Sequence, residues 1–383
     1  MKEKLKIAVL GYIVRGPLGG LVWHHFQYVY GLVQMGHEVL FIEDSEKYAS
    51  CYNPETFELT KDPSYGLAFI KNIFSKYGLK ANWTYYDFHT NKWFGKTKNE
   101  VDRFLKETDV LLNISGVNPL RERMRKIPKK VFIDTDPVFT QIRHLTEPDA
   151  LNLAQQHNVF FTFGENFGKS NCSIPDDGME WKHTRQPVVL DFWENENIKN
   201  NGIWTTVMQW DSYKVREWEN QQYGMKSKSF NLFADLPKLV PEKFELAIGS
   251  ESAPKEKLKE LGWGIANPLE VTKTPESYQN YIWRSKGECG IAKHGYVVTN
   301  SGWFSERSAA YLACSKPVIV QETGFSDCIE TGAGLFSFKN ISELKEIFQM
   351  VHRDYDFHSK KAWEICSSYF NHKTVLENLL SNS

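Results

Sequence analysis

The sequence of 383 residues lacks the features that define several classes of protein. It has no run of the roughly 20 apolar residues that span a bilayer, and residues 1–5 lead into a strand-like segment without a signal-peptide core. It also lacks a charge bias, because 46 lysines and arginines face 47 acidic residues. That balance argues against a protein that coats nucleic acid or anionic membrane. We expect a cytoplasmic protein of two domains.

Paired cysteines are missing as well. The six cysteines are scattered, and no two form a C-x-x-C motif. Free thiols in a reducing compartment fit this spacing better than a disulfide framework, and no cysteine-rich zinc site is offered. No metal site is expected. Aromatic residues are abundant instead, with 12 Trp, 17 Tyr and 25 Phe, which first of all fill cores.

The first half of the chain alternates between short apolar runs and segments of helical period. The runs end on glycine or on polar residues, as buried parallel strands do. Gly36 follows the first helical segment, where a left-handed helix cap is favoured. This alternation predicts a doubly wound parallel sheet. The expected strands are 6–11, 37–42, 83–86, 109–114, 130–133 and 159–163, and the expected helices are 21–35, 65–77, 101–107 and 119–126.

The periodicity stops over residues 169–202, which are rich in proline, glycine and polar residues and are typical of a connector. Alternation then resumes, and the chain closes on helical segments. The predicted fold class is α/β, with two Rossmann-like doubly wound domains facing a cleft and a helical tail. The predicted parts are an N-terminal domain 1–185, a linker 186–202, a C-terminal domain 203–365 and a tail 366–383.

The loop after the first strand, residues 11–20, is rich in glycine but does not fit G-x-G-x-x-G. A dinucleotide-binding fingerprint is therefore absent. Glu43 and Asp44 end the second strand, where a carboxylate holds the ribose of a dehydrogenase cofactor, but without the glycine pattern this indication is weak. The alternative is that the glycines form a tight turn and let the first helix pack closely on the sheet.

Two histidines, His24 and His25, lie in the first turns of the first helix. Adjacent helical residues point about 100° apart, so the two form a poor metal pair, and only one can face a cleft. A helix N-terminus disfavours the cationic imidazole, which suits a neutral general base. An ordinary packed histidine is the alternative.

The pair Gly19-Gly20, the helix that follows and the segment Gly36-His37-Glu38-Val39 resemble the opening of the two-domain glycosyltransferases with the GT-B fold. In inverting members a histidine just after the first strand often deprotonates the acceptor hydroxyl. The resemblance places that role on His24, the preferred position, or on His25. It also places Gly19 and Gly20 in the donor site.

The triplet Ser301-Gly302-Trp303, the polar helix start that follows and the Ala-Cys-x-x-Pro-Val-Ile motif of residues 313–319 resemble the donor-binding segment of the same enzymes. Ser305 is a good N-cap, and the N–H groups of the next three residues are suited to an anion. The resemblance implies that this helix start meets a nucleotide diphosphate, with Glu306 on the ribose. The alternative is a helix start that is only capped and solvated. The implied donor residues are Lys293, His294, Ser301, Gly302, Trp303, Ser305, Glu306, Arg307, Thr323 and Gly324.

This segment departs from one pattern of the family. Retaining members of the glycogen-synthase-like type carry two glutamates eight positions apart, and here those positions hold Gly302 and Ala310. The inverting mechanism is therefore favoured.

Two more segments are candidates for the cleft. Asp134 and Asp136 follow a strand, where a catalytic carboxylate belongs, although Asp136 precedes Pro137 and also fits a helix cap. Lys226 is a candidate for phosphate contact, and a solvated pair with Lys228 is the alternative.

The predicted function is metal-independent transfer of a sugar from a nucleotide-diphosphate donor, such as a UDP sugar, to a hydroxyl acceptor. The nucleotide sugar is the co-substrate, and no further cofactor is expected. A catalytically silent binding protein of the same shape is one alternative. A transferase acting on nucleic-acid bases is the other, and it needs a basic groove that the net charge of −1 does not indicate.

Overall fold

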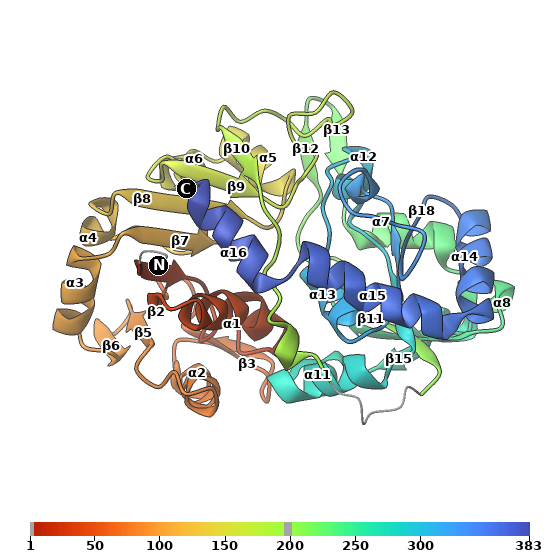
Figure 1. Cartoon of the computed structure of the whole chain (residues 1–383), viewed down its shortest axis with the longest axis horizontal. Helices are drawn as coiled ribbons and strands as arrows, with labels where there is room; N and C mark the ends of the chain where they lie inside the picture. Colours follow the sequence, from red (N-terminus) through yellow and green to blue (C-terminus); the bar gives the residue numbers. More distant parts are fainter. Residues whose placement is uncertain (1–3, 195–200) are drawn as a thin grey trace.

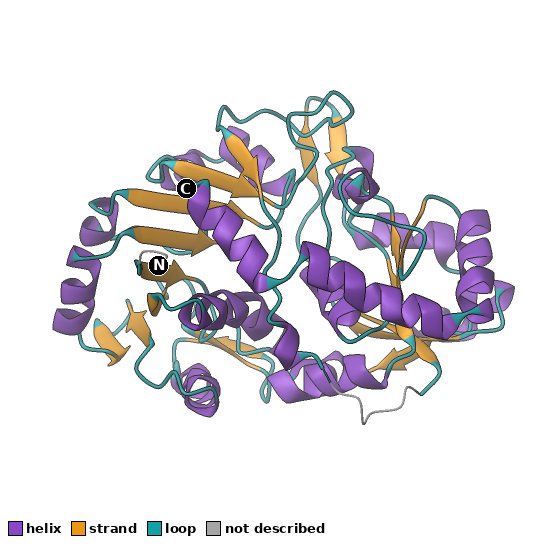
Figure 2. Ribbon diagram, in the orientation of Figure 1, coloured by secondary structure: helices purple, strands orange, loops and turns teal. Residues whose placement is uncertain are grey.

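The computed structural model describes residues 4–194 and 201–383. The chain forms two α/β domains side by side, the first coloured red to yellow and the second green to blue in Figure 1. Each domain contains a sheet covered by helices (Figure 2). The two-domain α/β architecture predicted from the sequence is confirmed. In the described part of the chain no helix is long and apolar enough to cross a membrane.

The first sheet has the strand order β10-β9-β8-β7-β1-β2-β5-β6, and all its pairs are parallel except that of β5 with β6. A short antiparallel hairpin, β3 and β4, lies outside it. The strands are β1 (Lys6–Leu10), β2 (Glu38–Asp44), β3 (Cys51–Asn53), β4 (Glu58–Thr60), β5 (Trp83–Asp87), β6 (Lys92–Gly95), β7 (Val110–Ile114), β8 (Lys129–Asp134), β9 (Val159–Thr162) and β10 (Trp181–His183). The helices are α1 (Gly19–Gln34), α2 (Ser64–Lys76), α3 (Lys98–Lys106), α4 (Glu122–Arg125), α5 (Phe139–Thr146) and α6 (Pro148–Ala154), and η1 (Leu190–Phe192) follows in the connector.

Side chains of β1 alternate between two hydrophobic layers, because successive residues of a strand point to opposite faces. Ile7 and Val9 belong to the cluster that includes α1 and α2 residues. Ala8 and Leu10 belong to a second cluster with α3 and α4 residues. This double burial explains why the strand is a continuous apolar run.

The second sheet is parallel throughout, with the order β15-β14-β11-β16-β17-β18. Its strands are β11 (Ile203–Gln209), β14 (Lys243–Gly249), β15 (Gly264–Ala266), β16 (Gly287–Gly290), β17 (Val318–Gln321) and β18 (Leu335–Phe338), and a hairpin consists of β12 (Arg216–Trp218) and β13 (Gln221–Tyr223). The helices are α7 (Lys226–Phe230), η2 (Asn231–Phe233), α8 (Leu236–Leu239), α9 (Lys255–Glu260), α10 (Pro268–Thr272), α11 (Pro275–Arg284), α12 (His294–Val298), α13 (Glu306–Ala313), η3 (Phe325–Asp327), α14 (Ile341–Arg353), α15 (Tyr355–Tyr369) and α16 (His372–Ser381).

The connector differs from the structureless segment that its composition indicates. Strand β10 lies within it and extends the first sheet beside β9. Trp181 in β10 stacks on His144, and its indole N–H donates to Asp177 at 2.8 Å. Tertiary contacts, which composition does not encode, therefore order this segment. Residues 195–200 of the predicted linker lie outside the described residues.

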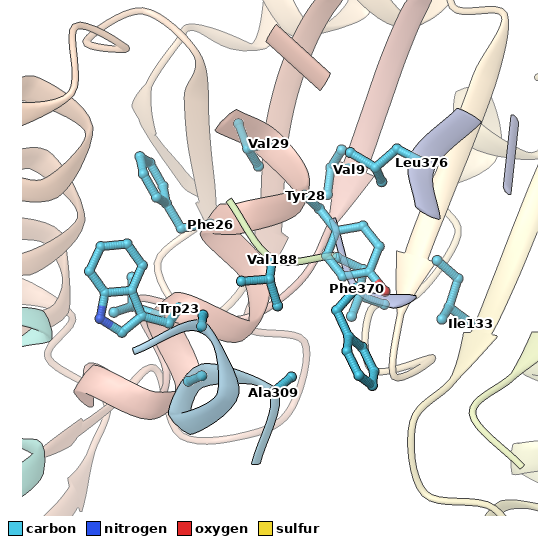
Figure 3. Close-up of a cluster of buried hydrophobic side chains, with 14 of the residues drawn as sticks. Val9, Trp23, Phe26, Tyr28, Val29, Ile133, Val188, Ala309, Phe370 and Leu376 are labelled. Carbon is cyan, nitrogen blue, oxygen red and sulfur yellow. The ribbon is translucent and has the colours of Figure 1, made fainter. Parts of the chain in front are cut away.

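One buried cluster joins both domains and the C-terminal helices (Figure 3). It contains Val9 of β1 and Trp23 of α1 together with Ala309 of α13 and Leu376 of α16. The helical tail therefore packs back against the first domain, where a Cβ atom on Gly31 of α1 would meet Leu376 at 2.9 Å. This shared core fixes the two domains relative to each other.

Candidate active site

A cleft of about 870 Å³ separates the carboxyl ends of the two sheets. The first-domain wall comes from the segments after β1, β7 and β8 and from the β3–β4 hairpin. The second-domain wall comes from the segments after β11, β14, β15 and β16, together with Lys226 of α7 and Tyr278 of α11. Ligands of doubly wound sheets bind at such strand ends. Of the residues predicted from the sequence, Gly20, His24, Asp136, Lys226, Lys293, Trp303, Ser305, Glu306 and Arg307 line this cleft.

Helix α1 begins at the cleft without a side-chain cap. Its N-cap is Leu18, which offers no hydrogen-bonding side chain, and the first turn contains no acidic residue. Free N–H groups and the helix dipole therefore make this end attractive to an anion or a polar sugar group. Gly20 lines the cleft, whereas Gly19 is a packing residue: a Cβ atom there would lie 2.4 Å from the carbonyl oxygen of Thr274.

The two histidines of α1 have different surroundings. His24 is half-buried and lines the cleft. Burial lowers its pKa, which the Glu306 carboxylate counteracts, and its Nδ1 has no hydrogen-bond partner among the described residues. His25 is fully buried, with Nδ1 2.8 Å from the carbonyl oxygen of Leu21. Burial holds the pKa of His25 well below its usual value. Of the two, His24 is the one that can reach a substrate.

The buried carboxylate of Glu43 holds the loop between β1 and α1. It accepts hydrogen bonds at 2.7 Å from the backbone N–H groups of Ile13, Val14 and Arg15. Burial raises the pKa of Glu43, while these N–H groups and the Arg15 guanidinium act in the opposite direction. Its oxygens are thus already occupied inside the protein, which argues against the ribose-binding role considered from the sequence.

Positive charge on the second-domain wall is concentrated at Lys226 and Arg307. The Arg307 guanidinium is fixed from behind by Glu288 (2.5 Å) and by the carbonyl oxygen of Val207 (2.8 Å). Lys226 is 8% exposed, and its ammonium group has no hydrogen-bond or ion-pair partner among the described residues. Burial, reinforced by Arg307, holds its pKa well below the usual value. An anion in the cleft would relieve this cost, because an opposite charge favours the ammonium form.

Helix α13 also begins at the cleft. Ser305 is its N-cap, as the sequence predicts, and its hydroxyl accepts from the Arg307 N–H at 3.2 Å. That N–H group is therefore not free for a ligand, contrary to the prediction of three open donors. Glu306 is exposed on the first turn and close enough to His24 to influence its pKa. The structure thus places the Glu306 carboxylate near His24, a neighbour that the sequence did not predict for it.

Asp136 and Lys293 link the two domains across the cleft. The Lys293 ammonium lies 2.9 Å from Asp136 and sits over the rings of Phe139 and Tyr213. Tyr213 and Tyr296 also donate to Asp136. Both charges are therefore satisfied by the protein, and neither offers a free group to a ligand in this arrangement.

Asp134 is buried and does not line the cleft. Its carboxylate accepts from the hydroxyls of Thr140 (2.6 Å) and Thr162 (2.8 Å) and from the side-chain amide of Gln141 (3.1 Å). Burial raises its pKa. This environment makes Asp134 an anchor for the segment before α5 rather than a base. In the described ranges no group of three or more His, Cys, Asp or Glu side chains is arranged to hold a metal ion.

Several predicted donor residues instead form the contact between the domains. Gly302 and Gly324 have positive φ values of 77° and 92°, and both pack against Asn166 of the first domain. The Asn166 N–H donates to the carbonyl oxygen of Ser301 at 3.1 Å. Thr323 donates its hydroxyl to the carbonyl oxygen of Trp303 at 2.6 Å. These residues shape the cleft from behind.

His294 also lies away from the cleft lining, at the start of α12. Its Nδ1 accepts from the Gly224 N–H at 3.3 Å, and burial lowers its pKa. It therefore supports the segment before Lys226.

Sequence reasoning missed several residues of the cleft. Ser250 follows β14 and Asn267 follows β15, so the strand-end rule applied to Asp136 could have found both. Lys255 and Phe57 also line it. No local pattern singles out these two, because one starts a short helix and the other lies in the turn of the β3–β4 hairpin.

No known protein-family model matches the sequence, and no curated protein matches it. Solved structures do match over nearly the whole chain, and they share one architecture, the GT-B fold. At sequence identities of 10–13%, these structural matches show the fold and nothing further.

One match is an alpha-glucosyltransferase in complex with UDP and a 13-mer DNA containing a HMU base, with a TM-score of 0.59, 11% identity and 99% of each chain covered. Another is Anabaena Alr3699/HepE in complex with UDP, with a TM-score of 0.56, 13% identity and 98% of this chain and 99% of that chain covered. A third is a glycosyltransferase from Rickettsia africae ESF-5, with a TM-score of 0.52, 12% identity and 99% and 97% covered.

Proposed function

We propose that this protein transfers a sugar from a nucleotide-diphosphate donor, of which UDP sugars are the first to test, to a hydroxyl acceptor. One observation carries the proposal: the uncapped start of α1 and His24 face Lys226 and the start of α13 across a single cleft. Hydrogen-bond donors and positive charge stabilise a departing diphosphate, and a base on the opposite side of the cleft can take the proton of the acceptor. The UDP complexes of proteins with the same fold support the choice of nucleotide.

In the finer form of the proposal the reaction is metal-independent and inverts the anomeric centre. Lys226, Arg307 and the helix starts stabilise the departing diphosphate. His24 takes the proton of the acceptor hydroxyl from the first-domain side. Its lowered pKa keeps the imidazole neutral at neutral pH, as a base must be.

The test has two parts. Isothermal titration with UDP, with and without magnesium, measures binding; binding that depends wholly on magnesium would contradict metal independence. Incubation with a panel of UDP sugars then measures UDP release, and NMR of the product gives its anomeric configuration. Retention at the anomeric carbon would remove the inverting form and leave sugar transfer in place.

A catalytically silent nucleotide-binding protein is the second candidate. The observation in its favour is Gly302, which occupies the position of the first glutamate of retaining members and is closed by the Asn166 backbone. This candidate predicts UDP binding without UDP release from any sugar donor. The UDP-release assay separates the two.

A further inference from the structure

We infer that the acceptor is an uncharged hydroxyl compound that presents a flat apolar face, as aryl glycosides and phenols do. This inference rests on the proposed function and adds the chemical class of the second substrate. It follows from the charge distribution of the cleft and from the side chains at its mouth.

The two walls of the cleft differ in charge. The lysines and arginines that line it, Lys226, Lys255, Lys293 and Arg307, all belong to the second domain. Among the described residues, the first-domain wall contributes one charged side chain, Asp136, which is paired with Lys293. The second-domain wall can therefore bind an anionic donor. On the first-domain wall, no described lysine or arginine lines the cleft to pair with an anionic acceptor such as a sugar phosphate or a nucleic acid.

Arg15 lies beside this wall, next to the Tyr12 ring, but it is not among the described residues that line the cleft. Its side chain is 12% exposed, its Nε lies 3.5 Å from Glu43, and its Nη2 donates to the carbonyl oxygen of Val117 at 3.4 Å. Its guanidinium is also flanked by the rings of Tyr12 and Tyr48. The Arg15 guanidinium thus makes its contacts with protein groups beside the wall, and in the described part of the chain the first-domain wall itself contains no lysine or arginine.

Aromatic side chains take the place of charge on this wall. Tyr12, Tyr52 and Phe57 line the cleft, with Leu18 and Leu21 beside them. Burial raises the pKa of Tyr12 to about 12, so its phenol stays neutral. Rings of this kind bind flat apolar faces by stacking and leave the acceptor hydroxyl free to reach a base.

Phe57 is the side chain that most strongly indicates an acceptor with an apolar face. Its side chain is 68% exposed, which is a large apolar area to leave in water, and its φ of 62° lies in the left-handed region that bulky residues avoid. The surrounding hairpin is held on both sides: the Tyr52 N–H donates to the carbonyl oxygen of Arg15 at 3.0 Å, and Glu55 lies 3.8 Å from Lys273 of the second domain. The hairpin therefore holds the Phe57 ring at the cleft mouth, where an apolar substrate face would cover it.

The experiment uses 4-nitrophenyl β-glucoside, glucose and glucose 6-phosphate as acceptor probes, with a single-stranded oligonucleotide as a fourth. Binding to the full chain is measured by saturation-transfer NMR in the presence of UDP, so the result does not depend on turnover. We expect the aryl glycoside to bind at least tenfold more tightly than glucose, and the two anions not to bind. Tighter binding of glucose 6-phosphate or of the oligonucleotide would overturn the inference.

Two variants locate the site. Phe57→Ala should weaken aryl glycoside binding about tenfold and leave UDP affinity unchanged. Leu59→Ala is the matched control, because Leu59 is 75% exposed on the same hairpin and is not a lining residue. Equal effects of the two variants would overturn the assignment to Phe57. Absence of UDP binding or release in the wild-type protein would count against the proposed function instead, and aryl glycoside binding would then be measured without the nucleotide.

Discussion

A Cβ atom on Gly302 would lie 2.6 Å from the backbone nitrogen of Asn166, a residue of the other domain. The position that the sequence resemblance aligns with a glutamate of retaining glycosyltransferases is thus closed by a backbone contact between the domains. Glycine at this position is therefore part of the packing of the two domains.

Replacing Gly302 should therefore cost stability. Gly302→Ala combines a left-handed backbone with the Asn166 contact, and we expect a loss of about 2–5 kcal/mol in the free energy of unfolding. Gly168→Ala is the control, because Gly168 has a φ of 83° with nothing within 4 Å of its Cβ position, so only the backbone term of about 1–2 kcal/mol applies. Urea unfolding of both variants measures the difference. Equal losses would show that the contact between the domains adjusts to the extra methyl group without a loss in the free energy of unfolding.

Lys226 should be the main cationic contact of the nucleotide. Lys226→Met should weaken UDP binding by roughly tenfold to a hundredfold, the equivalent of one lost charged hydrogen bond of about 1.5–3 kcal/mol. Lys228→Met is the matched control, because Lys228 is exposed two residues further on and does not line the cleft. Isothermal titration with UDP measures the affinity of both variants. An unchanged affinity in Lys226→Met would assign the diphosphate to another part of the wall.

The pH dependence of transfer should depend on His24 and Glu306 together. Burial lowers the pKa of His24, so kcat/KM should fall only below about pH 6.5, as the imidazole becomes protonated. His24→Ala should reduce kcat by about 10²–10⁴-fold with UDP affinity nearly preserved. Full activity in both His24→Ala and His25→Ala would remove the base from α1.

Glu306 should shift this pH profile. Its negative charge raises the pKa of His24, so Glu306→Gln should lower that pKa and move the acid limb of kcat/KM to lower pH. The control is Glu251→Gln, a cleft-lining carboxylate that does not contribute to the His24 shift. An unmoved acid limb, together with weaker UDP binding, would assign Glu306 to the ribose alone.

The Glu43 carboxylate should be required to hold the loop before α1. Glu43→Gln removes the charge that three N–H groups share, and we expect a loss of about 1–3 kcal/mol in the free energy of unfolding. Glu38→Gln, at the exposed start of the same strand, should change it by no more than about 0.5 kcal/mol. Thermal unfolding compares the two. Equal melting temperatures would mean that the loop is held by its other contacts.

Much of the fold is determined by local pattern. Apolar runs such as Ile7–Leu10 are buried on both faces of a parallel sheet, and this double burial is what makes them continuous. The end of α1 just before Gly36 follows from the conformational freedom of glycine, and the start of α13 after Ser305 follows from a hydroxyl cap. The same local logic predicts that His24 and Glu306, each near the start of a helix, lie at the ligand-binding edge of their own domains.

Only the tertiary structure decided what those side chains do beside one another. Lys293 and Asp136 form an ion pair across 157 positions of sequence, and Gly302 packs against the backbone of Asn166 in the other domain. The Glu43 carboxylate accepts hydrogen bonds from N–H groups of a loop 28–30 positions away in sequence. Phe57 lines the cleft because the β3–β4 hairpin packs at the mouth of the cleft. Such contacts depend on how two domains and their loops meet, and that geometry leaves no periodic signal in the chain. The sequence by itself determined the elements and the edge at which ligands bind, and the packing of the domains decided which residues there remain free for them.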